Sequence, residues 1–412
     1  MSKRAAILTN DIECERHIQY YARIEKYLIA NGWEIAADLK RLDKVIVCAC
    51  GFHDFMYKKV RKILGLLKEA GLREEDIVIA GCLTKTHELE LKGDFKGNLI
   101  VTHKELELDK IIGAETAFDA IEPDNLFNVF AQADAGGSDR IFYIKIAEGC
   151  LGGCSYCVIK KGKGALRSVL PDEIRRQFSL AIEGGHRRIF LMGEDTFAYG
   201  IDIGTDIISL AESLLSIEPD VDFYFGNLHN RWLGEYADDI HSLCKKGVIK
   251  KLHIGLQHVN EGLLEKMGRL ARRSGRPVSP KHIYKIIQGL KKEFPGLYLS
   301  ADIMVGFPGE TDEIFDELVE FFKRDRCFNN ISHFGFSDVK AADTFRYKDK
   351  IDPLRIAVRW DRLKEVLGER SFYNSTDSPD NYGLAYKMSL ENDLFFCKDS
   401  FIPVKEKPLR VH

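Results

Sequence analysis

Three closely spaced cysteines are the residues of this sequence whose types and spacing most clearly indicate chemistry. Cys150, Cys154 and Cys157 are separated by three and then two residues, and they directly follow a strand-like segment, residues 141–147. Three thiolates at this spacing can hold three irons of a 4Fe–4S cubane and leave the fourth iron without a protein ligand. The open iron is then a place where a substrate or a cofactor can coordinate.

Two other uses of these cysteines fit the sequence less well. Zinc could bind the three thiolates with His186 or His253 as a fourth ligand. Structural zinc sites usually pair two cysteine knuckles, and the sequence has no second one. A disulfide framework is disfavoured, because ten cysteines in 412 residues are far fewer than in a disulfide-rich secreted domain. The spacing therefore favours an iron–sulfur cluster.

The first hundred residues alternate strands and helices. Strands are predicted at 5–9, 45–47 and 77–80, with helices at 15–31 and 55–70, each helix stopped by a glycine. This alternation predicts a doubly wound parallel sheet.

Three further cysteines follow these strands. Cys14, Cys50 and Cys82 each come just after one of them, so they should meet at the carboxyl edge of the sheet, where open α/β sheets bind ligands. This placement predicts a second iron–sulfur cluster. Cys48 competes with Cys50, because it lies two residues earlier and points the same way if the strand continues. The plainer interpretation of any one of them is a small buried apolar side chain.

A second alternation begins at residue 141 and predicts a partial (β/α)6 barrel with its chemistry at the carboxyl ends of the strands. Its strands are predicted at 141–147, 188–192, 222–226, 252–255, 298–305 and 330–336. The domains are then expected to be a cluster domain at 1–102, a linker at 103–140, the partial barrel at 141–350, and a C-terminal helix with a divergent or truncated tail at 351–412. The helix of this last part is predicted at 354–368.

The bulk composition excludes several classes of protein. With 60 Lys and Arg against 63 Asp and Glu, the net charge is −3, so no general attraction to polyanions is expected. The start of the chain becomes polar too soon for a signal peptide, and no run is long enough to span a membrane. A reducing cytoplasm fits this cysteine usage.

The motifs together resemble the radical S-adenosylmethionine (SAM) methylthiotransferase family over roughly residues 5–350, and most closely its branch that modifies an aspartate of a ribosomal protein. The resemblance is carried by Cys14 and by residues 50–52, 80–82, 149–157, 193–200, 252–258, 267–269 and 302–311. Two positions depart from the family pattern. Glu194 stands where glutamine is usual, and Gly255 stands where proline is usual.

The resemblance implies two 4Fe–4S clusters and SAM as cofactors. Cys150, Cys154 and Cys157 would hold the SAM cluster, and Cys14, Cys50 and Cys82 the auxiliary cluster. The residues expected near SAM are Tyr156, Arg167, Gly193, Glu194, Gly306 and Ser337. Most basic residues at 160–163 and 269–276 are interpreted as solvated loop charges. An electron donor such as a flavodoxin or ferredoxin is implied as a partner.

The implied activity is insertion of a methylthio group into an unactivated C–H bond. The SAM cluster would cleave SAM to a 5′-deoxyadenosyl radical, and the auxiliary cluster would supply sulfur methylated by a second SAM. Because the family's small C-terminal barrel is not recognised after about residue 350, a peptide or protein side chain is expected as substrate and a tRNA adenosine comes second. An iron–sulfur electron-transfer or sensing protein is the alternative from a different class.

Overall fold

The computed structural model describes residues 3–10, 14–126, 140–270, 279–372 and 395–396. The chain divides into two compact units. Unit 1 comprises residues 1–140, 161–163 and 393–412, and unit 2 comprises residues 141–160 and 164–392. No helix among the described residues is long and apolar enough to cross a membrane.

Unit 1 is built on a mostly parallel sheet. Its strands are β1 (Lys3–Thr9), β2 (Trp33–Ile35), β3 (Lys44–Cys48), β4 (Ile77–Ala80), β5 (Asn98–Ile100) and β15 (Phe395–Phe396). The parallel strands lie in the order β2-β1-β3-β4-β5, and β15 pairs antiparallel with the end of β1. This order reverses between β1 and β3, and open α/β sheets bind ligands beside such a switch point.

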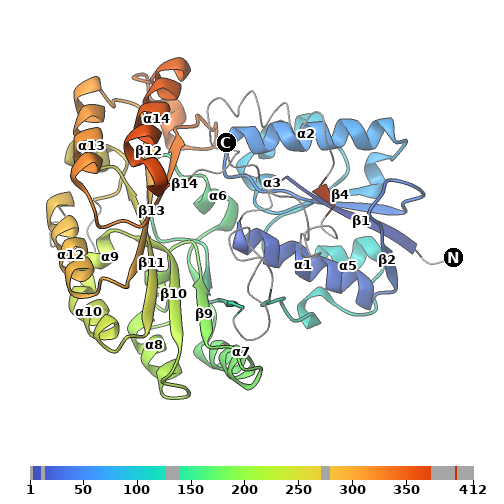
Figure 1. Ribbon diagram of the computed structural model, residues 1–412. Helices are drawn as coiled ribbons and strands as arrows, with labels where there is room; N and C mark the ends of the chain where they lie inside the picture. The colour runs from blue at the N-terminus through green and yellow to red at the C-terminus, as the bar shows by residue number, and fades with distance from the viewer. Residues whose placement is uncertain (1–2, 11–13, 127–139, 271–278, 373–394, 397–412) are drawn as a thin grey trace. The chain divides into compact units, whose positions relative to one another are not determined.

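Helices cover both faces of this sheet, as continuous apolar strands require. They are α1 (Glu15–Ala30), α2 (Asp54–Glu69), α3 (Leu83–Thr86), α4 (Glu88–Asp94) and α5 (Glu107–Ile112). In Figure 1, α2 lies over one face of the sheet, and α1 and α5 lie over the other. One core joins alternate residues of β1 and β3 to the inner face of α2, for example Leu8, Val47 and Val60. The predicted doubly wound unit is therefore confirmed.

The segment predicted as a linker contributes structure to unit 1. It contains α5 and a short 3-10 helix, Phe118–Ala120, which both contact α1. The Tyr27 hydroxyl donates to Asp109 at 2.6 Å, and Nε of Arg23 donates to the carbonyl of Ile121 at 2.7 Å. The lack of a long apolar run at 103–126 hid these polar anchors from sequence interpretation. Residues 127–139 lie outside the described part of the chain.

Unit 2 is a curved parallel sheet with helices outside it. Its order is β6-β9-β10-β11-β12-β13-β14, and every neighbouring pair is parallel. The strands are β6 (Phe142–Lys145), β9 (Arg188–Met192), β10 (Asp222–His229), β11 (Ile249–Gln257), β12 (Tyr298–Val305), β13 (Asn330–Gly335) and β14 (Ser371–Phe372). A short antiparallel ribbon, β7 (Ala147–Glu148) with β8 (Arg167–Ser168), stands beside this sheet. The six predicted strands are present, and β14 adds a seventh.

Helices of unit 2 line the outer face of the sheet (Figure 1). They are α7 (Pro171–Glu183), α8 (Ile207–Leu215), α9 (Arg231–Glu235), α10 (Ala237–Lys245), α12 (Pro280–Glu293), α13 (Asp312–Arg324) and α14 (Pro353–Leu367). Two short helices, α6 (Ile159–Lys163) and α11 (Glu261–Lys266), follow β7 and β11 in the chain. Local sequence sets several starts. Pro171 opens α7, and the Thr311 hydroxyl accepts a hydrogen bond from the backbone of Ile314 at 3.3 Å. The C-terminal helix predicted at 354–368 is α14, and residues 373–394 and 397–412 lie outside the described part.

Candidate iron–sulfur and SAM site

The cysteine loop, residues 149–157, follows β7 directly within unit 2 and is braced by two other segments. The backbone N–H of Ser155 donates to the carbonyl of Met267 at 3.0 Å, and its hydroxyl donates to the carbonyl of Lys266 at 3.1 Å. On the other side, the N–H of Thr344 donates to the carbonyl of Ser155 at 3.1 Å. The loop is therefore held by segments that follow β11 and β13, at the carboxyl edge of the sheet.

Glycines make room for the sulfurs of this loop. The N–H of Gly152 donates to Sγ of Cys150 at 3.1 Å. A Cβ at residue 152 would lie 3.2 Å from Sγ of Cys150, which is a tight contact, and 3.8 Å from Sγ of Cys154, which is ordinary van der Waals contact. Gly149 has a φ of +80°, and a Cβ there would come 2.2 Å from the carbonyl oxygen of Ala165. The loop is thus shaped around its sulfurs.

The thiols of this loop are largely buried, and burial disfavours their charged thiolate form. Burial, followed by the nearby Asp195, raises the pKa of Cys150 to about 12. Burial and Cys154 raise the pKa of Cys157 to about 11, although the backbone N–H groups of Ile159 and Lys160 lower it. Bound iron offsets such costs, because metal coordination deprotonates a thiol outright. Amide hydrogen bonds to cluster sulfurs are common and help set the reduction potential.

The two histidines considered as a fourth zinc ligand have other surroundings. Among the described residues, no three His, Cys, Asp or Glu side chains are placed as ligands of one metal ion. His253 is paired through both ring nitrogens, with Ser300 at 2.8 Å and Asp302 at 3.1 Å. His186 precedes β9 and so lies at the amino edge of the sheet, away from the cysteine loop. Cubane ligands bind different irons, so they need not converge as ligands of a single ion do.

The residues expected near SAM come from several strand ends, and the structure brings some of them together. Oε2 of Glu194 accepts a hydrogen bond from the N–H of Gly149 at 2.8 Å, which links the end of β9 to the cysteine loop. The ring of Tyr156 meets Phe307 edge-on at 6.3 Å, and Phe307 meets Phe336 in the same way at 5.8 Å. These aromatic contacts place Tyr156 beside the chain neighbours of Gly306 and Ser337.

The other expected residues have more ordinary surroundings. Arg167 is exposed on β8, opposite Glu148 of β7. The carbonyl of Gly193 accepts a hydrogen bond from the side chain of Asn227 at 3.2 Å. Ser337 is half-buried just past β13. A Cβ at Gly306, where φ is +81°, would come 2.4 Å from Cγ1 of Ile356, so packing of α14 already requires glycine there.

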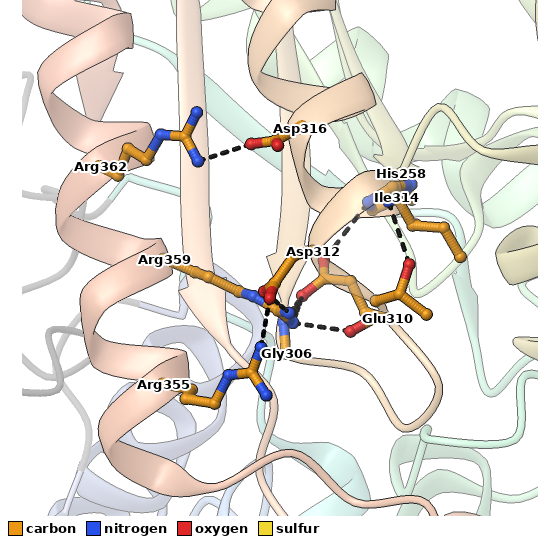
Figure 2. Close-up of polar contacts among 10 residues, drawn as sticks. His258, Gly306, Glu310, Asp312, Ile314, Asp316, Arg355, Arg359 and Arg362 are labelled. Carbon is orange, nitrogen blue, oxygen red and sulfur yellow. Dashed lines mark hydrogen bonds and ion pairs between the residues drawn. The ribbon is translucent and has the colours of Figure 1, made fainter.

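A buried ionic cluster holds the turn after β12 against α14 (Figure 2). Oε2 of Glu310 accepts hydrogen bonds from the N–H of Gly306 and from Nη1 of Arg359, both at 2.7 Å. Oε1 of Glu310 lies 3.4 Å from Nε2 of His258, and Glu310 and His258 are fully buried. Nη2 of Arg359 donates a hydrogen bond to Oδ1 of Asp312 at 2.7 Å. The motif at 302–311 therefore anchors α14 through its glutamate.

Asp195 belongs to a second buried ionic group that sequence interpretation did not identify. Its carboxylate accepts hydrogen bonds from the indole N–H of Trp232 at 2.8 and 2.9 Å, and from Nη2 of Arg231 at 3.2 Å. Burial raises the pKa of Asp195, while Trp232 and Arg231 act in the opposite direction. The group joins the end of β9 to α9. The available signal in the sequence was that Asp195 and Arg231 follow two successive strands, β9 and β10.

Arg269 differs from the solvated loop charge that the sequence predicts for most of its basic neighbours. It is buried, and its Nη1 donates to Sγ of Cys154 at 3.6 Å. Burial alone would lower its pKa, but Tyr156 and Cys154 more than offset this and raise it. The neighbouring basic residues Arg272, Arg273 and Arg276 lie outside the described part of the chain. Its place in the motif Met267-Gly268-Arg269 was the available signal.

The strand-end cysteines of unit 1, Cys14, Cys50 and Cys82, lie at the carboxyl edge of its sheet. Sγ of Cys82 accepts a hydrogen bond from the N–H of Gly51 at 3.0 Å, so Cys82 lies beside the turn that carries Cys50. Cys14 immediately precedes α1, which follows β1. Since β1 and β3 flank the switch point, Cys14 and Cys50 follow the two strands between which ligands bind in such sheets.

Asn10 braces this edge. Its side-chain oxygen accepts from the N–H of Cys50 at 2.8 Å, and its side-chain nitrogen donates to the carbonyls of Cys50 and Met56 at 2.9 and 3.1 Å. Cys48 differs from Cys50. It ends β3 in register with Thr9 and Ala80, it is fully buried, and burial raises its pKa. Its surroundings fit a core thiol, whereas Cys50 lies beyond the strand.

A partial barrel with a three-cysteine loop at its carboxyl edge defines a radical SAM enzyme, and the comparisons agree. Residues 144–322 match the model of the radical SAM superfamily. The structure of TsrM from Kitasatospora setae, a radical S-adenosylmethionine methyltransferase, matches over 81% of this chain and 75% of TsrM, with a TM-score of 0.52 and 15% identity. The structure of OxsB, a cobalamin-dependent S-adenosylmethionine radical enzyme, matches over 95% of this chain and 62% of OxsB, with a TM-score of 0.52 and 11% identity. At these identities the likeness concerns the fold alone.

Curated relatives narrow the class. The ribosomal protein uS12 methylthiotransferase RimO of Carboxydothermus hydrogenoformans is 30% identical over 360 residues, 84% of this chain and 78% of the relative. A probable threonylcarbamoyladenosine tRNA methylthiotransferase of Pyrococcus abyssi is 30% identical over 353 residues, 82% of this chain and 76% of the relative. The chain belongs to the radical SAM methylthiotransferase family. It is therefore an enzyme of this type, with a 4Fe–4S cluster and SAM as cofactors.

Proposed function

We propose that this enzyme inserts a methylthio group into an unactivated C–H bond of a peptide or protein side chain, with two 4Fe–4S clusters and two SAM molecules. Cys150, Cys154 and Cys157 hold the SAM cluster in this proposal. The observation that carries it is the cysteine loop itself. Its glycine at 152 leaves room for the sulfur of Cys150, and its backbone donates to the carbonyl of Met267 and accepts from the N–H of Thr344. When bound there, a 4Fe–4S cluster with one open iron supplies the electron that cleaves SAM.

The residues around the loop have roles that follow from their placement. Glu194 lies within hydrogen-bond distance of Gly149, so its carboxylate can take a charge-assisted hydrogen bond from the ammonium group of SAM at the loop. The rings of Tyr156, Phe307 and Phe336 form an apolar wall beside the loop. Such a wall reduces access of water to a reactive radical. Arg167, Gly193, Gly306 and Ser337 are proposed to complete the SAM site from neighbouring strand ends.

The second cluster is assigned to Cys14, Cys50 and Cys82. The support is their position on three successive strand ends of one sheet, two of which flank the switch point, and the hydrogen bond from Gly51 to the sulfur of Cys82. A C–H bond without acidity cannot be opened by acid–base chemistry, and the resulting carbon radical needs a sulfur donor. In this proposal unit 1 holds that donor.

The substrate class rests on charge and on motif. Net charge is −3, with 60 basic and 63 acidic residues, so binding to RNA has no general electrostatic support. The segment 193–200 resembles the protein-modifying branch. Relatives of both kinds match this chain to a similar extent, so a tRNA adenosine is the second candidate. A flavodoxin or ferredoxin is the proposed electron donor.

Anaerobic reconstitution with SAM and dithionite tests the activity. The expected product is 5′-deoxyadenosine, and its absence from a preparation loaded with iron would defeat the proposal. Adding ribosomal protein uS12, or bulk tRNA in a parallel reaction, tests the substrate class by mass spectrometry. Methylthiolation of a polypeptide and none of tRNA is the result expected. The opposite pattern would transfer the assignment to tRNA.

A further inference from the structure

A buried arginine lies against one sulfur of the cysteine loop. Arg269 is 6% exposed. Its Nη1 donates to Sγ of Cys154 at 3.6 Å, and its Nη2 donates to the carbonyl oxygen of Gly255. Its Nε has no hydrogen-bond partner among the described residues. The guanidinium is thus fixed at two points, one of which is a cysteine of the loop.

The charge of this arginine lacks a partner carboxylate within ion-pair distance among the described residues, unlike Arg231 and Arg359. Asp195 acts on this charge from beyond ion-pair distance, and its carboxylate is already bonded to Arg231 and Trp232. A buried cation whose charge is compensated only from a distance is costly. A cluster bound by cysteine thiolates is an anion, and Cys154 would place it within reach of Nη1. The surroundings of Arg269 therefore point to a negative group at the loop.

The backbone around Arg269 is shaped for this contact. Gly268, with φ of +72°, lies so close to the loop that a Cβ would come 2.8 Å from the carbonyl oxygen of Gly153. On the other side, a Cβ at Gly255 would lie 3.1 Å from Nη2 of Arg269. Gly255 is also the position where proline is usual in the family. Two glycines thus let the loop, the guanidinium and the end of β11 approach one another.

We infer that Arg269 is a positioning residue for the SAM cluster, which holds Cys154 and raises the reduction potential of the cluster through its buried positive charge. The inference rests on the proposed cluster at Cys150, Cys154 and Cys157. Reduction makes the cluster more negative, and a fixed cation beside a ligand sulfur stabilises that state. Hydrogen bonds to cluster sulfurs and local charge are recognised determinants of such potentials.

The test compares Arg269→Gln and Arg269→Lys with wild type, each reconstituted as the full chain. The readout is the ratio of reduced to oxidised cluster at poised potentials, from the electron paramagnetic resonance signal that changes when SAM is added. Arg269→Gln should lower that ratio about tenfold at a given potential, which equals 59 mV for a one-electron couple. Arg269→Lys keeps the charge and should restore part of the difference. Arg362→Gln, which removes an arginine paired with Asp316, is the control and should leave the ratio unchanged.

Gly255→Ala provides a second variant that retains the arginine. Its added Cβ must displace Nη2 by a few tenths of an ångström, so a smaller decrease in the same direction is expected. This variant decides the question if Arg269→Gln does not retain iron. Unchanged ratios in the arginine variants or in Gly255→Ala, with normal iron content, would overturn the inference. Iron content unaffected by replacing Cys150, Cys154 and Cys157 would instead overturn the cluster assignment on which it rests.

Discussion

The two cysteine sets differ in how the chain brings their sulfurs together. In unit 2, three cysteines share one short loop, and three hydrogen bonds of Ser155, with Met267, Lys266 and Thr344, fix its course. In unit 1, three cysteines follow three different strands, and their proximity depends on the whole sheet and on the Asn10 brace. Local sequence thus specifies the first site and topology specifies the second. Damage to the fold should affect the second site more.

The largest expected effect comes from removing the cysteine loop's sulfurs. Replacing Cys150, Cys154 and Cys157 by alanine in one variant should reduce formation of 5′-deoxyadenosine to background, because these three residues are the proposed ligands of the cluster that cleaves SAM. Product analysis after anaerobic incubation with SAM and dithionite measures this. The strand-end cysteines should still bind their iron. Persistent cleavage of SAM would contradict the assignment of the loop.

The next effect separates two neighbouring cysteines of unit 1. Cys50→Ala should lose the iron assigned to that unit, whereas Cys48→Ala should keep it and lose about 1 kcal/mol of stability for the smaller core side chain. The difference follows from the placement of Cys48 inside β3 and of Cys50 beyond it. Iron analysis and denaturant unfolding of both variants measure it. Iron loss in Cys48→Ala alone would reverse the ligand assignment.

A third effect concerns the stability of unit 2 alone. Arg359→Met removes the cationic partner of the buried Glu310 and leaves the N–H of Gly306 and the ring of His258 beside its carboxylate, so unit 2 should lose about 3–5 kcal/mol of unfolding free energy. Arg362→Met, which breaks the more exposed pair with Asp316, should cost less than about 1 kcal/mol. Denaturant unfolding followed by hydrogen exchange assigns each loss to a unit. Equal costs for the two variants would show that burial of the first pair does not matter.

The smallest effect is a pH dependence from a buried histidine. Burial lowers the pKa of His333 to about 4, and its ring packs on Trp360. The unfolded chain binds this proton below its ordinary value of 6.5, so stability should fall as pH drops from 6.5 toward 4, by up to about 1.4 kcal/mol per pH unit. Urea unfolding of wild type and His333→Gln over this range measures it. The variant should have a flatter profile, and identical slopes would exclude His333 as the source.

The same difference between local and topological signals explains which parts of the fold and of the site could be predicted from the sequence. The strands, the parallel sheets and the partial barrel were predictable, because apolar runs and helix stops are local signals. The position of Cys14, Cys50 and Cys82 at one edge followed from the parallel direction of their strands. The motif at 267–269 marked Arg269 but did not reveal its burial, because that burial depends on two glycines and on a loop more than a hundred residues away. The ion pair of Glu310 could not be predicted either, since its partner Arg359 comes from α14, far along the chain.

The central claim is that each unit holds its own cluster, and iron content tests it most directly. The measurement compares reconstituted wild type with a variant in which Cys14, Cys50 and Cys82 are all alanine. Two clusters predict that iron per chain falls by roughly half in the variant, while SAM is still cleaved to 5′-deoxyadenosine. Unchanged iron in a folded variant would contradict the account and leave the cysteine loop as the one supported cluster site.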